Sequence, residues 1–339
     1  MNRRELLRAL SVAGALVSIP SHGALENNYP RAVDTTDISE YELMNAHLWK
    51  TFSLSKSKRA VYPLVRQQLD LLTASLQRSH TSQTKKQLCA LTSDIFQLAG
   101  EIFFDSSRYT DAAHCYTLAA SAGKEANAYD LWACALTRHA FIGIYDHSFT
   151  ETAPMLAAAS QIAQRGDSRL STRYWVAAVQ AELFAGLGDL DGCDRALGTA
   201  EAVHGLSGQV HNGGWLRFDG SRLAEQRGTC YARLGRYDLA ETALTDALTK
   251  SLSLRRRGSI LTDLALLSMQ RGEIDRVLKY GDTALELFLN TNSGYLGRKL
   301  QELQLQLAPM TSDNRVANFT DHISERPALH GGSERKRGV

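Results

Sequence analysis

The sequence predicts an all-α fold, a right-handed superhelical α-solenoid built from stacked helix pairs. Three observations predict it. Only six prolines occur among 339 residues, and none lies between residues 155 and 308, a span filled with strong helix formers. Small residues recur at fixed offsets in five segments of the chain. Inside each segment stands a break between helices, where glycine is frequent and a left-handed turn residue is expected.

The elements follow in order along the chain. Residues 38–57 carry an apolar pattern that predicts a first helix, and a second begins near Pro63 and runs to about residue 79, since proline fits a first helical turn. The repeated part fills the middle, and residues 309–339 are polar and aperiodic, which predicts a disordered tail. We therefore expect a lead-in helix and linker over 1–37, a solenoid over 38–308 and a tail over 309–339.

The five segments share one spacing. Each starts on glycine or alanine, reaches the break seven residues later and an apolar or aromatic anchor two residues after that, and ends on alanine. The segments are 100–119, 140–159, 181–200, 228–247 and 265–284. The breaks are Ser107, His147, Gly188, Gly235 and Gly272, and the final alanines are Ala119, Ala159, Ala200, Ala247 and Ala284. Two helices joined by a tight turn cross closely only where side chains are small, so these positions predict helix contacts.

The fourth segment matches a known repeat pattern nearly position for position, in Gly228, Tyr231, Gly235, Tyr237, Ala240 and Ala247. From about residue 92 to 290 the chain resembles the tetratricopeptide repeat proteins. Successive final alanines lie 40, 41, 47 and 37 residues apart, against about 34 in the family. The resemblance implies repeats near 93–126, 133–166, 174–207, 221–254 and 258–291.

Terminal repeats need a cap that is polar on its outer side. We expect a capping helix over 293–307, with Leu296, Leu300, Leu303 and Leu307 facing inward.

A narrower resemblance concerns residues 1–10, residues 38–52 and the following units of about 40 residues. Together they look like the C-terminal sensor half of actinobacterial helix-turn-helix regulators. This resemblance implies a regulator-like sensor without its DNA-binding domain, so direct contact with nucleic acid is not expected.

The family resemblance implies a concave groove, lined by the first helix of each pair, for a peptide or protein partner. The inward positions are Asp94, Gln97, Glu101, Thr137, Phe141, Tyr145, Trp175, Glu182, Arg222, Glu225, Thr229, Arg233, Thr262 and Met269. Their aromatic rings and mixed charges suit a short peptide held by stacking and charge-assisted hydrogen bonds. The alternative is that several of them only cover the groove or pair with one another. Asp94, Cys134 and Trp175 stand where a clamp for a terminal carboxylate needs basic residues, so that ligand is not expected.

Other function classes lack a signal. The sequence contains no GxSxG, GxGxxG or P-loop motif, so no enzyme activity, cofactor or metal site is expected. The net charge of +2 is too small to create an electrostatic field that attracts nucleic acid or anionic membranes to the whole chain. Five cysteines without CxxC spacing predict buried free thiols and a cytoplasmic protein. The sequence does not predict an oligomeric state.

The N-terminus allows two interpretations. Arg3 and Arg4 precede an apolar stretch over 9–19 and resemble a twin-arginine export signal, but that stretch is too short to span a bilayer. The first interpretation is an amphipathic lead-in helix of a cytoplasmic protein. The alternative is an exported or envelope-associated scaffold of the same repeat type. Mass spectrometry of the N-terminus distinguishes them, since export leaves a start near Leu25 and retention leaves Met1.

Overall fold

A computed structural model describes residues 35–325, apart from 56, 79, 209, 211–213 and 251. The described residues form helices and no strand, so the predicted all-α fold of helix pairs is confirmed. The right-handed superhelical sense stays a prediction. Most of the predicted lead-in segment over 1–37 lies outside the described residues; its last part, from Thr35, already belongs to the first described helix.

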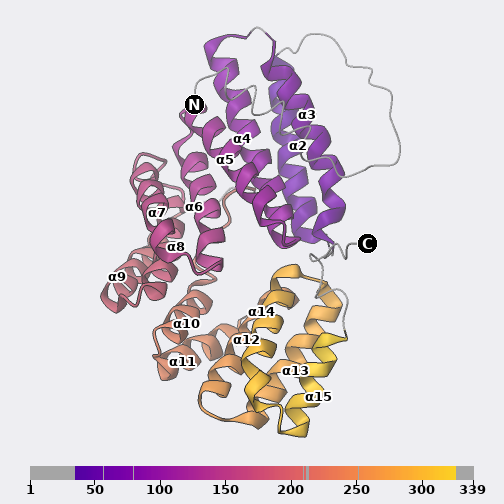
Figure 1. The fold of residues 1–339 in the computed structure, drawn as a ribbon. Helices are drawn as coiled ribbons and strands as arrows, with labels where there is room; N and C mark the ends of the chain where they lie inside the picture. The colour runs from indigo at the N-terminus through magenta and orange to yellow at the C-terminus, as the bar shows by residue number, and fades with distance from the viewer. Residues whose placement is uncertain are drawn as a thin grey trace. The chain divides into compact units, whose positions relative to one another are not determined.

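Figure 1 shows the order of the helices along the chain. The N-terminal helices are α2 (Thr35–Leu54), η1 (Lys58–Val61), α3 (Tyr62–Leu76), α4 (Ser82–Asp105), α5 (Tyr109–Ala126), α6 (Tyr129–Tyr145) and α7 (Phe149–Ala163). They are followed by α8 (Thr172–Gly186), α9 (Leu190–Glu201), η2 (Ala202–Gly205), α10 (Leu223–Arg233) and α11 (Tyr237–Leu248). The chain continues through α12 (Leu254–Gln270), α13 (Ile274–Thr291), α14 (Gly294–Leu307), η3 (Ala308–Met310) and α15 (Asn314–Ser324).

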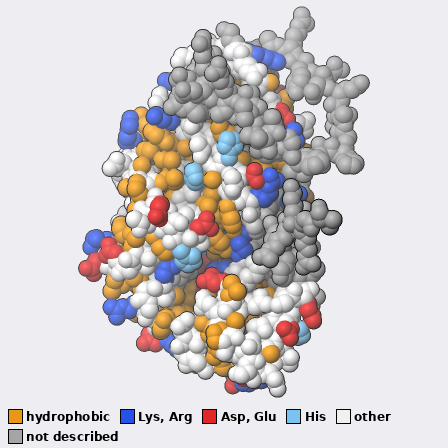
Figure 2. Space-filling view, in the orientation of Figure 1, with side chains coloured by type: hydrophobic (Ala, Val, Ile, Leu, Met, Phe, Trp, Pro, Cys, Tyr) orange, Lys and Arg blue, Asp and Glu red, His pale blue; other side chains and the backbone are white. Residues whose placement is uncertain are grey.

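The described residues divide into two compact units. The first unit takes in the residues up to 104, then 109–179 and 202–219. The second takes in 105–108, 180–201 and the residues from 220 onward. Within the first unit α6 packs against α5 and α7, and within the second α12 packs against α13. Figure 2 shows acidic and basic side chains interspersed with hydrophobic ones over the described part of one face.

The recurrent small residues lie where helices touch. The five final alanines of the repeated segments are all buried. A β-carbon added at Gly100 would lie 2.3 Å from the ring of Tyr116, and one added at Gly228 would lie 2.4 Å from Leu244. Both neighbours are themselves buried. The absent side chain therefore lets a large residue of the next helix fill the space, as the sequence predicted.

All five predicted breaks adopt the left-handed backbone conformation. Gly188, Gly235 and Gly272 have φ angles of 76°, 71° and 73°. Ser107 and His147 have φ angles of 62° and 58°, although they carry side chains. Residues other than glycine rarely adopt this region, so the turn geometry is fixed by the packing of the helices on either side.

We expect Gly228→Ala to lower the free energy of unfolding by about 1–3 kcal/mol, because the new methyl group overpacks a filled contact. The added β-carbon meets Leu244 Cγ, which cannot swing aside as a side-chain tip would. Gly198→Ala is the matched control, since Gly198 is an exposed helical position of the same unit with nothing within 4 Å. Helix propensity there predicts a gain of about 0.5–1 kcal/mol. Urea denaturation of both variants measures the difference, and equal effects would contradict the contact.

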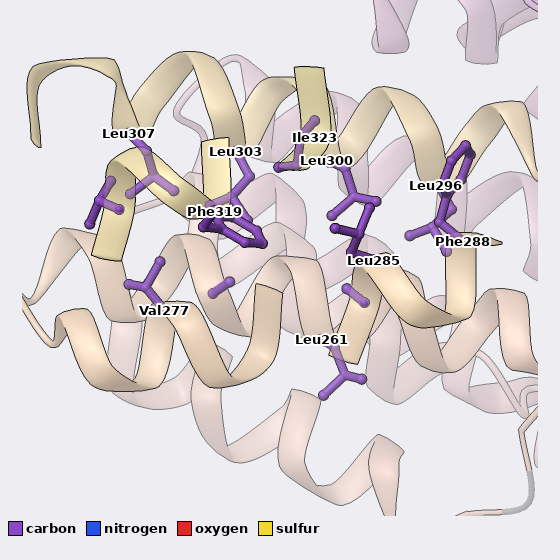
Figure 3. Close-up of a cluster of buried hydrophobic side chains, with 13 residues drawn as sticks. Leu261, Val277, Leu285, Phe288, Leu296, Leu300, Leu303, Leu307, Phe319 and Ile323 are labelled. Atoms are coloured by element: carbon purple, nitrogen blue, oxygen red, sulfur yellow. The ribbon is translucent and has the colours of Figure 1, made fainter. Parts of the chain in front are cut away.

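The C-terminal core joins four helices, α12 to α15. Leu296, Leu300, Leu303 and Leu307 of α14 are buried and point toward α13 and α15, as Figure 3 shows. The predicted tail is wrong over its first part, because residues 314–324 form α15. Asp313 caps this helix by accepting a hydrogen bond from the Arg315 amide, and Phe319 and Ile323 are buried. Apolar residues three and four apart form the stripe that makes this polar segment fold.

Two further sequence expectations concern the cysteines and helices that could cross a membrane. All five cysteines are buried free thiols, which agrees with the prediction. Among the described helices, none combines the length and the apolar character that crossing a bilayer requires.

Candidate functional site

Arg138 of α6 is the centre of a polar cluster in the first unit. Its Nε donates to Glu101 Oε1 at 3.2 Å, its Nη1 donates to Gln97 Oε1, and its Nη2 donates to the Trp215 carbonyl oxygen at 2.6 Å. The side chain is only 11% exposed. The five-donor fork of arginine is well suited to bind several acceptors at once. Arg138 therefore joins α4, α6 and the segment after α9 at one point.

Two indole rings lie beside the same guanidinium. The Arg138 Cζ atom is 5.6 Å from the ring centroid of Trp49 on α2 and 5.0 Å from that of Trp175 on α8. A cation within about 6 Å of an aromatic face is attracted by the ring quadrupole. We name the set Asn45, Trp49, Asp94, Gln97, Glu101, Arg138 and Trp175 the Arg138 cluster.

Asp94 supplies the buried carboxylate of this cluster. Asn45 Nδ2 donates to it at 2.8 Å and Trp49 Nε1 donates to it at 2.7 Å. Burial raises the pKa of Asp94 from 3.8 to about 6, while these two hydrogen bonds and the charges of Arg138 and Arg217 oppose the rise. Desolvation thus outweighs the local donors, and the carboxylate titrates near neutral pH.

A non-helical segment between η2 and α10 contacts the cluster. We name residues 214–218 the strap. Leu216 is 1% and Phe218 5% exposed, whereas Trp215 is half-buried and Arg217 is exposed. The alternation of buried and exposed residues is that of an extended strand, in which successive side chains point to opposite sides.

Arg217 fixes the strap to α2. Its Nη2 donates to the Trp49 carbonyl oxygen at 2.8 Å, and its Nε donates to the Gly214 carbonyl oxygen at 3.0 Å. Its Cζ atom lies 5.2 Å from the Trp49 ring centroid. One tryptophan thus offers the arginine both an aromatic face and a backbone acceptor.

A cavity of about 270 Å³ opens beside the strap. Trp215 forms part of its wall, together with the start of α6 and the connection between α7 and α8. Asp130 accepts hydrogen bonds from the Asp167 amide at 2.8 Å and from the Thr172 hydroxyl. Arg165 donates to the Tyr129 hydroxyl at 2.6 Å. The wall therefore combines aromatic rings with charges of both signs.

The structure separates the predicted groove residues of the first unit into three groups. Asp94, Gln97, Glu101 and Trp175 meet in the Arg138 cluster. Phe141 and Tyr145 form an aromatic group with Phe104 and Tyr109, with ring centroids 5.4–5.9 Å apart. Thr137 was wrongly expected at the groove, because it is buried and its hydroxyl donates to the Ala133 carbonyl.

In the second unit two of the predicted residues form polar contacts with neighbours outside the predicted set. Gln226 donates to Glu182 at 3.2 Å, and Arg256 donates to Glu225 at 2.7 Å through its Nε. Burial raises the pKa of Glu182, and the charge of Arg233 opposes this. These two carboxylates therefore already have polar partners within the unit.

The other predicted residues of this unit differ in their exposure. Thr229 donates to Asp263 at 3.5 Å, and Lys299 binds the same carboxylate at 2.6 Å. Arg222 precedes α10 and is exposed. Thr262 is buried and donates to the Gly258 carbonyl, and Met269 packs against the C-terminal core. Thr262 is thus a second threonine wrongly expected to face a ligand.

Sequence reasoning missed the residues that organise the site. Arg138 follows Cys134 by four positions and precedes Phe141 by three, so it shares their helix face with Thr137, and spacing alone does not separate the two. Trp49 was recognised only as part of an apolar helix. Trp215 and Arg217 lie between η2 and α10, and no periodic pattern marks where such a segment packs.

Comparison with known proteins leaves the family open. No family model and no curated protein matches the chain. Solved structures do match, and one is a crystal structure of a Rap protein complexed with competence and sporulation factor. It is 10% identical, with a TM-score of 0.49, over 87% of this chain and 100% of that chain. A likeness at this level identifies neither a ligand nor a function for this chain.

Proposed function

We propose that the chain is a non-enzymatic scaffold or sensor that binds a peptide or protein, and that the Arg138 cluster is a binding site. One observation carries the proposal: the cluster already holds a non-helical segment of the chain, the strap. Arg138 binds a strap carbonyl at 2.6 Å, and Trp49 receives the guanidinium of Arg217. Groups that hold one extended segment through its backbone offer similar contacts to another peptide.

The resemblance to tetratricopeptide repeat proteins supports the same function, since their inner helices bind peptides. Preformed donors add to this support. Glu101 and Gln97 hold the Arg138 side chain in place, so little side-chain entropy is lost when it binds an acceptor. The cavity beside Trp215 adds room at one end of the strap.

Selection of a displayed peptide library against the wild-type chain tests this function. Selected peptides are expected to lose at least about tenfold in affinity for Trp175→Ala, because a half-buried aromatic anchor is removed. Trp132→Ala is the matched control, since Trp132 is also half-buried in the first unit but belongs to a separate apolar cluster. Selected peptides that bind Trp175→Ala as tightly as wild type would count against this site.

The finer roles belong to the same proposal. A regulator-like sensor in the cytoplasm would use the Arg138 cluster to read a peptide signal. An exported scaffold, favoured by Arg3 and Arg4, would use it to hold a partner in the envelope. Both share the binding step and differ only in where it takes place, which the N-terminal mass measurement decides.

A further inference from the structure

We infer that the strap is an internal ligand of the Arg138 cluster, and that its chemistry names the class of peptide bound there. That class is an extended peptide in which an arginine stands between two bulky apolar residues. The inference rests on the proposed function and deepens it. The strap sequence from residue 214 to 218 is Gly-Trp-Leu-Arg-Phe.

The apolar part of this recognition follows from burial. Leu216 and Phe218 are almost fully buried although they belong to no helix. Two residues apart in an extended segment, they point to the same side. The strap therefore buries two bulky apolar side chains, two positions apart, within the first unit.

The basic part follows from the groups around Arg217. Its guanidinium lies over Trp49, donates to the Trp49 carbonyl at 2.8 Å, and is close enough to Asp94 to oppose the rise of that pKa. An acidic group, an aromatic face and a carbonyl acceptor together favour arginine over lysine, since only arginine has a planar fork. An acidic residue at this position would be repelled by Asp94.

Backbone recognition completes the description. Arg138 Nη2 donates to the Trp215 carbonyl, a contact that any residue at this position of a bound peptide can make. Trp215 itself borders the 270 Å³ cavity, so a larger residue fits on that side. The apolar, basic and backbone parts together therefore recognise two apolar residues, one arginine and one backbone carbonyl.

An internal ligand changes the affinity for an external one. A peptide that occupies the strap's position can bind only those molecules in which the strap has moved away. Its apparent affinity is the intrinsic affinity multiplied by the fraction of such molecules. Weakening the strap should therefore raise the affinity for the peptide without changing the site. Replacing a residue of the binding site itself should instead lower the affinity for the peptide.

The probe is the acetylated and amidated peptide Gly-Trp-Leu-Arg-Phe-Asp, labelled with fluorescein and titrated against the full chain by anisotropy. The double variant Leu216→Ser/Phe218→Ser is expected to bind it at least about tenfold more tightly than wild type. Arg217→Ala changes an exposed residue and should keep the fold, and it is expected to gain about three- to tenfold. The same peptide carrying Arg217→Glu is expected not to bind either variant.

Two results would overturn the inference. One is that neither the double variant nor Arg217→Ala binds the probe more tightly than wild type, provided that Arg217→Ala has wild-type helicity. The other is equal binding of the arginine and glutamate peptides. If library peptides lacking this pattern bind the Trp175 site and the probe does not displace them, the proposed function stands and this inference fails. If no peptide depends on Trp175, the proposed function fails first.

Discussion

Arg138→Ala is expected to lower the free energy of unfolding by about 3–5 kcal/mol, the cost of removing one partner from a buried ionic network. The variant leaves the Trp215 carbonyl and the Gln97 side chain without their donor, and Glu101 without its ion pair. It also removes a charge that stabilises the ionised form of Asp94, so the pKa of Asp94 should rise above about 6.

Arg165→Ala is the matched control for this prediction. Arg165 lies in the same unit and also contacts an aromatic ring, at 4.2 Å from the Tyr129 centroid, but it is exposed. Exposed pairs of this kind contribute about 1 kcal/mol or less. Urea denaturation followed by circular dichroism measures both variants. A loss below about 1 kcal/mol for Arg138→Ala would mean that the cluster does not organise the unit.

The second large effect is a dependence of stability on pH through Asp94. Its pKa is raised from 3.8 to about 6 on folding, so the folded chain binds this proton more tightly than the unfolded chain. The contribution of Asp94 to stability is complete below pH 4 and is lost as the pH rises through 6. A shift of about two units corresponds to about 3 kcal/mol.

Asp94→Asn isolates this contribution, because an amide at the same position does not titrate. The unfolding free energy of wild type minus that of the variant should fall by about 3 kcal/mol between pH 4 and pH 7. Other acids with shifted pKa values, such as Glu182 and Asp167, are present in both chains and cancel in the difference. A difference that stays constant over this range would show that Asp94 is ionised in the folded chain throughout.

The repeat geometry could be predicted from sequence because it depends on local steric limits. Gly228 and Ala247 permit a close helix crossing, and Gly235 permits a left-handed turn, whatever the rest of the chain does. The same logic identified His147 as a break by its spacing alone, although its residue type does not favour the turn. Such features need only a few neighbouring residues and are therefore readable along the chain.

The site could be predicted only in part, because it depends on contacts between distant segments. Asp94 and Trp175 were found from their register on the inner face. The partners that change their chemistry come from α2 and from the strap, and Arg217 lies 168 positions from Trp49. Helix α15 was missed for a related reason: its apolar stripe is short, and only the core around Phe319 makes it stable.

The placement of the tryptophans has a practical consequence. Three of the four in the chain, Trp49, Trp175 and Trp215, lie at the Arg138 cluster or on the strap. Replacing Trp132 by phenylalanine would leave an emission spectrum that comes from this one place alone. The purified protein thus carries its own fluorescent reporter, and the wavelength and intensity of its emission should change with whatever occupies the site, with no dye attached.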